Sequence, residues 1–182
     1  MTELTILDPR AAIGVAITPY ALSIDIARPG LRIALVSNGF FDASKLLTCV
    51  GTALTGRLQS ARVKLYEYQN PSLMLAADVV AEIARDNDVA VTALGHCGSC
   101  TSSATRNAVS LARAGMPVTA LISEKFFQGG AFVARSVGMP DVPRVQLPHP
   151  VSGTGTPRIT AIAEAAAPHI IAAWRGAHER AA

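Results

Sequence analysis

Two cysteines three positions apart are the residues of this sequence best suited to chemistry. Cys97 and Cys100 lie in the stretch Gly-His-Cys-Gly-Ser-Cys-Thr-Ser-Ser, between an apolar run and a helical pattern. A turn from strand to helix presents unpaired backbone N–H groups and a partial positive charge, which stabilise a thiolate placed there. Cys97 precedes the helix and can face a cleft, while Cys100 lies about one turn further on, close enough to form or resolve a disulfide. The spacing predicts thiol chemistry with Cys97 as the attacking group.

Two plainer interpretations compete with thiol chemistry. A Cys-x-x-Cys pair can be half of a zinc site, but a second cysteine pair is missing from the sequence. His96, His149 and one acidic residue would then have to complete the ligand set. Alternatively, the pair is inert, since cysteines are often buried as small apolar side chains. The third cysteine, Cys49, falls among apolar residues of a helical pattern and is predicted to belong to the core.

The elements that must position these thiols follow from the hydrophobic periods. Short apolar runs that end at turn signals predict five strands, at residues 31–36, 62–68, 89–94, 118–122 and 144–147. Helical spacing predicts a helix after each strand: one capped by Asp42, one capped by Ser72, one through Ala104–Ala112 that Gly115 stops, one at 127–137 and one at 159–175.

Five strand–helix units with short connections favour a parallel sheet covered on both faces. We therefore predict an α/β fold, an open doubly wound five-stranded sheet of flavodoxin-like order 2-1-3-4-5, because a closed barrel needs about eight units. Residues 1–30 do not fit the repeat and are predicted to form an N-terminal arm. The arm and the units in 31–182 make up one α/β domain covering residues 1–182.

In this strand order the first and third strands are neighbours, and their turns meet at the edge where open α/β folds bind ligands. The substrate is expected between the turn at Asn38 and Gly39 and the turn at Cys97. The Asn38 amide could bind a substrate carbonyl or carboxylate, or serve only as a turn residue. Glu124 and Lys125 follow the fourth strand, where they could transfer protons, pair with a charged substrate or lie in a solvated loop.

The remaining candidates are two histidines and two hydroxyl residues. His96 adjoins Cys97, and as imidazolium it would stabilise the thiolate, unless adjacent side chains point apart. His149 lies in a stiff Pro-His-Pro segment after the fifth strand, one strand further out. Thr101 and Ser102 are expected either to cap the helix or to bind an anion with their hydroxyl and N–H groups.

Composition excludes several function classes. Of the 182 residues 50% are hydrophobic and 16% charged, which is far from the pattern of a disordered chain. The net charge is +3, and the basic residues are scattered, so no nucleic-acid site is predicted. No apolar stretch is long enough to cross a membrane, and no leader pattern opens the chain. Three cysteines do not make a secreted disulfide framework, so we expect a cytoplasmic protein.

Cofactor and assembly predictions follow the same reasoning. Walker and dinucleotide-binding signatures are missing from the sequence, so no nucleotide and no other cofactor is predicted. The low charge and low aromatic content fit a chain that buries part of its surface in a homo-oligomer.

The Cys-Gly-Ser-Cys turn followed by Thr101 and Ser102 resembles the UGSC-motif family, in which a selenocysteine often holds the first position. More remotely it resembles the selenocysteine-containing B component of glycine, sarcosine and betaine reductases. The resemblance extends over most of the chain. Its further motifs are Asp-Pro at 8–9, the strand that ends at Asn38-Gly39, and Gly-Met-Pro at 115–117 leading to Glu-Lys-Phe at 124–126.

The resemblance implies a redox-active group at Cys97 with Cys100 as its partner. It also implies reduction at a carbon–heteroatom bond or thiol exchange. This chain departs from the family pattern because position 97 is cysteine rather than selenocysteine, which implies slower chemistry or a related reaction that tolerates a thiol.

Three functions remain open from the sequence. The first is a thiol-dependent oxidoreductase on a small molecule, with an external thiol reductant regenerating the pair. The second is a cysteine-dependent lyase, racemase or hydrolase, which needs Cys97 but no disulfide. The third is a redox subunit that works only within a larger complex with a partner subunit.

Overall fold

The computed structural model describes residues 15–68 and 70–176. A parallel sheet of order β2-β1-β3-β4-β5 forms the centre, which confirms the predicted α/β fold and strand order. The strands are β1 (Arg32–Ser37), β2 (Arg62–Glu67), β3 (Val89–Gly95), β4 (Val118–Ser123) and β5 (Arg144–Leu147). The helices are α1 (Ala43–Thr55), α2 (Ala77–Asp86), α3 (Gly98–Arg113), α4 (Phe127–Ser136) and α5 (Thr156–Trp174), with a short 3₁₀ turn η1 (Glu124–Phe126).

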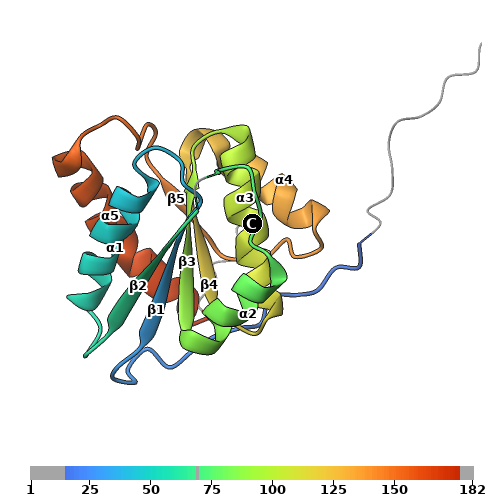
Figure 1. The fold of residues 1–182 in the computed structure, drawn as a ribbon, viewed down its shortest axis with the longest axis horizontal. Coiled ribbons are helices and arrows are strands. Elements are labelled where there is room, and N and C mark those ends of the chain that lie inside the picture. Colours follow the sequence, from blue (N-terminus) through green and yellow to red (C-terminus); the bar gives the residue numbers. More distant parts are fainter. Residues whose placement is uncertain (1–14, 69, 177–182) are drawn as a thin grey trace, which may run out of the picture.

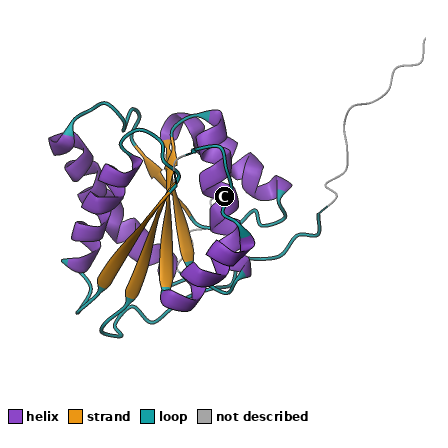
Figure 2. Cartoon of the chain, viewed as in Figure 1, coloured by secondary structure: helices purple, strands orange, loops and turns teal. Residues whose placement is uncertain are grey.

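The helices cover both faces of the sheet. Figure 1 shows α1 and α5 on one face and α2, α3 and α4 on the other, and Figure 2 shows the same three layers. Two buried clusters fill the spaces between the layers, one on each face. Every residue of β3 is buried because this strand is central and covered twice, whereas β2 is an edge strand with one buried residue, Tyr66. The carboxyl ends of β1, β3 and β4 therefore lie side by side under the loops that lead to the helices.

Helix α2 begins later than the sequence pattern predicts. Its first residue is Ala77, and Ser72 does not cap it. The intervening segment bonds to α3 instead: the Ser103 hydroxyl donates to the Leu73 carbonyl at 2.8 Å, and the Asn107 side-chain oxygen accepts the Leu75 N–H at 2.9 Å. These tertiary hydrogen bonds occupy backbone groups that a longer helix would have used.

Two other helix boundaries were predicted from single residues. Gly115 follows α3 with φ of 84°, and its N–H donates to the Ala112 carbonyl, so it stops the helix as expected. Asp42 stands at the N-cap position of α1, but its carboxylate makes no capping bond. It accepts from the Gly153 N–H and from the Lys45 ammonium, both at 2.9 Å. Asp42 therefore joins the start of α1 to the loop before α5.

The described part of the predicted arm runs along the domain, and residues 1–14 lie outside the described residues. The Thr18 N–H donates to the Gly138 carbonyl at 2.7 Å, and the Ile24 N–H donates to the Trp174 carbonyl at 2.9 Å. The Tyr20 hydroxyl accepts the Val118 N–H at 3.1 Å. In residues 15–68 and 70–176, no helix is long and apolar enough to cross a membrane.

Asp88 lies directly before β3 and binds two arginines at the amino end of the sheet. Its carboxylate accepts the Arg32 backbone N–H at 2.8 Å and the Arg32 guanidinium at 3.0 and 3.2 Å, and it pairs with Arg28 at 3.0 Å. Burial alone would raise the pKa of this carboxyl group, but the hydrogen bonds from Arg32 and Arg28 outweigh burial and lower the pKa to about 2.

We expect Asp88→Asn to lower the free energy of unfolding by about 2 kcal/mol at pH 7, because each pKa unit is worth about 1.4 kcal/mol. The folded-state pKa is lowered from 3.8. The stabilisation is therefore present above about pH 4 and disappears as the pH falls through the folded-state value. Urea unfolding between pH 7 and pH 2 measures the difference, with exposed Asp141→Asn as control. If the difference in free energy of unfolding between wild type and Asp88→Asn stays constant from pH 7 to pH 2, the lowered pKa of Asp88 is contradicted.

Candidate active site

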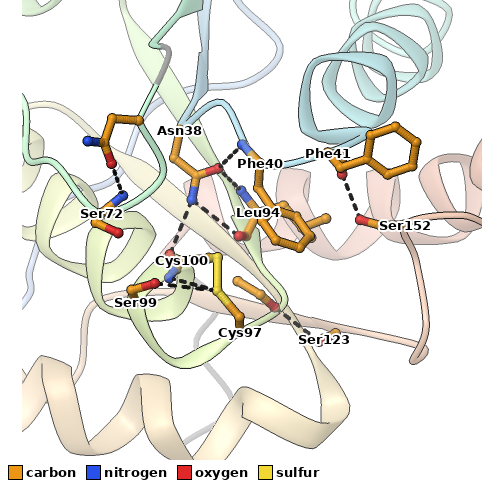
Figure 3. Close-up of a disulfide and its surroundings, with 12 residues drawn as sticks. Asn38, Phe40, Phe41, Ser72, Leu94, Cys97, Ser99, Cys100, Ser123 and Ser152 are labelled. Atoms are coloured by element: carbon orange, nitrogen blue, oxygen red, sulfur yellow. Dashed lines mark hydrogen bonds between the residues drawn. A yellow bond between two sulfur atoms is a disulfide. The ribbon is translucent and has the colours of Figure 1, made fainter.

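The two cysteines of the turn are joined by a disulfide at the start of α3, at the carboxyl edge of the sheet (Figure 3). Cys97 is the N-cap residue, in extended conformation, and Cys100 lies in the first helical turn. Their Cα atoms are 5.2 Å apart, inside the range that a disulfide requires. The Cys-x-x-Cys spacing at the start of a helix thus places the two sulfurs within bonding distance.

The two sulfurs differ in access and in hydrogen bonding. Cys100 is 0% exposed, whereas Cys97 is half-buried and is followed by exposed Gly98 and Ser99. The Cys97 sulfur accepts the Cys100 N–H at 3.2 Å and lies 3.6 Å from the Ser99 hydroxyl. Cys97 is therefore the more accessible of the two cysteines, while Cys100 is covered by protein. Both donors are suited to stabilise a thiolate on Cys97 when the pair is reduced.

Close packing of α3 and α4 against the sheet depends on two glycines that face Ile122. A Cβ atom on Gly95 would lie 2.9 Å from Ile122 Cγ1 and Cγ2 and 3.1 Å from the Thr101 hydroxyl. A Cβ atom on Gly130 would lie 2.5 Å from Ile122 Cδ1. The Ser123 hydroxyl adds a bond to the Gly95 carbonyl at 3.0 Å. The Ile122 side chain thus fills the space beside the cysteine turn, residues 97–100, and the space beside α4.

Asn38 and Gly39 stand at the end of β1, next to the disulfide. The Asn38 side chain is 2% exposed and bonds to main-chain groups of β3 and α3, so the protein itself uses its polar atoms. Gly39, with φ of 77°, lines a cavity of about 280 Å³. The other lining residues are Phe40, Asp42, Ser44, Lys45, Glu67 and Tyr68.

This cavity opens on the β2 side of the β1 turn. The substrate position expected between the turns of β1 and β3 stays a prediction. Its charged groups are Lys45 and Asp42, which pair with each other at 2.9 Å, and Glu67. The hydrogen bond from the Gly153 N–H is the main cause that lowers the pKa of Asp42, and the hydrogen bond from the Lys45 ammonium lowers it further. Sequence reasoning missed Glu67 and Tyr68, although the strand order 2-1-3 already places residues after β2 at this edge.

The two candidate histidines stack on each other, with ring centroids 4.5 Å apart, between Phe40 and Phe126. The His96 Nε2 accepts the Val151 N–H at 3.0 Å, so the neutral ring carries its proton on Nδ1. Burial, and then the neighbouring His149, lower the pKa of His96. The neutral form is therefore favoured, which argues against the predicted imidazolium that would stabilise the Cys97 thiolate.

The tautomer of His149 follows from its contact with Ser123. The Ser123 hydroxyl donates its one hydrogen to the Gly95 carbonyl. Its oxygen therefore accepts a hydrogen bond from His149 Nδ1 at 3.2 Å. In the neutral ring Nε2 then carries the lone pair. Through Ser123 at the end of β4, His149 is thus anchored to the end of β3, which leads into the cysteine turn.

The other predicted residues have distinct environments. Glu124 and Lys125 are exposed in η1, directly after β4. Thr101 and Ser102 lie inside α3, and the N-cap position belongs to Cys97, so neither residue caps the helix. Thr101 is 2% exposed and its hydroxyl has no partner among the described residues. The Ser102 hydroxyl accepts from Arg106 at 3.2 Å.

Cys49 and the question of a metal ion complete the survey of thiols and ligands. Cys49 is half-buried in α1, packs against the core and lies 3.6 Å from the Thr160 hydroxyl, as its core assignment predicts. Within the described ranges no three His, Cys, Asp or Glu side chains gather in a way that could hold a metal ion.

Fold and site together define a doubly wound α/β protein with a Cys-x-x-Cys disulfide at a helix N-terminus. The chain belongs to the UGSC family, whose model matches residues 5–176. This confirms the resemblance inferred from the cysteine turn and its flanking motifs. A comparison with curated proteins finds no match. Membership and the bonded cysteine pair are both compatible with a redox role.

Proposed function

We propose that the protein is a thiol-dependent oxidoreductase that reduces a small molecule with the Cys97–Cys100 pair. The observation that carries the proposal is the unequal exposure of two bonded cysteines at the carboxyl edge of the sheet: Cys97 is half-buried and Cys100 is 0% exposed. Such asymmetry assigns the first attack to the accessible sulfur and the second to the covered one. A reducing compartment such as the cytoplasm would keep the pair available as a dithiol.

The proposed cycle is balanced in electrons and protons. The Cys97 thiolate attacks an electrophilic sulfur or other heteroatom of the substrate and forms a covalent adduct with it. The bond from that atom to the rest of the substrate breaks, and the first fragment leaves with the electron pair and takes up a proton. The Cys100 thiolate then attacks the Cys97 sulfur, which closes the disulfide and releases the product. The dithiol loses two electrons and two protons, and the substrate gains both. When a carbon–heteroatom bond is cleaved, each of the two fragments takes one of those protons.

The cycle is completed by an external dithiol or a reductase subunit, which reduces the disulfide through a mixed disulfide on Cys97. The cavity beside Gly39 and Phe40 is our candidate for the substrate site, since both residues directly follow Asn38, which contacts Cys100. Membership of the family is compatible with the redox assignment, and this chain carries a cysteine at both ends of the turn.

The test is thiol mapping by mass spectrometry. Limiting alkylation of the reduced protein near neutral pH is expected to label Cys97 first, because Cys97 stands at the N-terminus of α3, where the Cys100 N–H stabilises its thiolate. Mild oxidation is expected to give the Cys97–Cys100 linkage reversibly while Cys49 stays reduced. Failure of Cys97 and Cys100 to cross-link under any oxidant, with activity retained, would replace this proposal by non-redox cysteine catalysis.

A further inference from the structure

The side chain of Asn38 joins three separate segments at the cysteine turn (Figure 3). Its oxygen accepts the N–H of Leu94 at 3.0 Å and the N–H of Phe40 at 3.2 Å. Its amide nitrogen donates to the carbonyl of Leu94 and to the carbonyl of Cys100, both at 3.2 Å. These four bonds use both lone pairs and both hydrogens of the carboxamide. The group is therefore fully engaged by the main chain.

The bond to Cys100 matters most, because it ties the first turn of α3 to the end of β1. Cys100 contributes the covered sulfur of the disulfide, and its main chain is held by a side chain that is itself 2% exposed. The N–H of Cys100 bonds to the Cys97 sulfur at 3.2 Å, so the same residue is held through both its N–H and its carbonyl. Through the Phe40 N–H, Asn38 also fixes one wall of the neighbouring cavity.

We propose that Asn38 is a positioning residue that sets the equilibrium between the dithiol and disulfide forms of Cys97 and Cys100. The disulfide needs the two Cα atoms close together, and here they are 5.2 Å apart. In the oxidised form the covalent bond itself maintains that distance. In the reduced form only non-covalent contacts maintain it, and Asn38 supplies the side-chain contact from β1 to the Cys100 main chain.

The direction of the effect follows from this difference between the two forms. Without the Asn38 bonds the first turn of α3 gains freedom mainly in the reduced form, which lowers the effective concentration of one thiol toward the other. Disulfide formation then becomes less favourable. Preorganisation by Asn38 therefore makes the cysteine pair a stronger reductant. This inference rests on the proposed function, because it requires a reversible disulfide.

The experiment equilibrates the protein with mixtures of reduced and oxidised glutathione, traps the thiols by alkylation and quantifies both forms by mass spectrometry. Asn38→Ala is expected to lower the equilibrium constant for disulfide formation about ten-fold, which corresponds to a reduction potential about 30 mV higher. Asn87→Ala is the matched control. Asn87 is 6% exposed and its amide donates to Tyr66 and to the Ile83 carbonyl, far from the cysteines at the other end of β3.

Both alanine variants are expected to lose stability, but only Asn38→Ala should shift the redox equilibrium. Asn38→Asp is the second variant in case the alanine variant does not fold. The aspartate side chain can still accept hydrogen bonds from the N–H groups of Leu94 and Phe40. It presents an oxygen instead of an N–H to the carbonyls of Leu94 and Cys100, so the equilibrium constant for disulfide formation is expected to fall in this variant too. An equilibrium constant within two-fold of wild type in the folded Asn38 variants, or an equal shift in Asn87→Ala, would overturn the inference. A wild-type protein with no reversible disulfide would instead overturn the proposed function.

Discussion

Replacing Cys97 with serine is expected to abolish turnover, whereas replacing Cys100 with serine should halt the reaction after its first covalent step. A hydroxyl at position 97 is a far poorer nucleophile near neutral pH unless a strong base activates it. With Cys97 intact and Cys100 replaced, attack on the substrate still proceeds, but the sulfur that closes the disulfide is missing. A covalent adduct or mixed disulfide should therefore accumulate on Cys97.

Intact-protein mass spectrometry after incubation with a disulfide probe distinguishes these outcomes. Cys49→Ser is the control, since Cys49 lies in α1 away from the cysteine turn, and it should leave both turnover and adduct formation unchanged. Multiple turnover in Cys100→Ser would show that Cys100 does not resolve the adduct and would favour a lyase, racemase or hydrolase. Full activity in Cys97→Ser would refute the whole assignment of the site.

Replacing Trp174 with alanine is expected to lower the free energy of unfolding by about 3–5 kcal/mol, the usual cost of emptying a large buried aromatic site. Trp174 is 0% exposed and belongs to the cluster under α1 and α5. Its carbonyl also accepts the Ile24 N–H at 2.9 Å, so the end of α5 anchors the arm. The cavity left by alanine would loosen the packing of this cluster and the contact between α5 and the arm.

Trp174→Phe should be much milder, because it keeps most of the ring volume and removes an indole N–H that has no partner among the described residues. Phe132→Ala provides the surface control, since Phe132 is 75% exposed on α4. Denaturant unfolding followed by circular dichroism compares the three variants. Equal destabilisation in Trp174→Ala and Phe132→Ala would contradict the burial of Trp174.

Strands and their order were predictable because the apolar runs are short, separated and regular. The run at β3 is almost entirely apolar, as a strand covered on both faces must be, and this marked it as central. The turn at Cys97 was predictable for a related reason: a strand followed by glycine, small polar residues and a helical pattern fixes where the helix starts. That the two cysteines lie at the carboxyl edge of the sheet then followed from the parallel strand order.

The start of α2 and the role of Asn38 depended on contacts between distant segments. Ser72 satisfies the local rule for a helix cap, but Ser103 and Asn107 bond to the preceding backbone instead. Asn38 has the residue type expected of a substrate-binding or turn position. Apart from the local bond to Phe40, its partners lie 56 and 62 positions away along the chain. Local patterns carry no information about such partners, so the sequence could identify the residue but not its contacts.

The shared contact of Ile122 with Gly95 and Gly130 makes these three positions mutationally interdependent. A methyl group added at Gly130 would meet the terminal carbon of Ile122, whereas one added at Gly95 would meet both of its γ carbons. Shortening Ile122 to valine removes the terminal Cδ1 atom but keeps both γ carbons. This change can therefore offset Gly130→Ala but not Gly95→Ala. Epistasis at this site is therefore directional: α4 can be brought to tolerate a larger residue through one compensating change, while the end of β3 before the cysteine turn keeps its requirement for glycine.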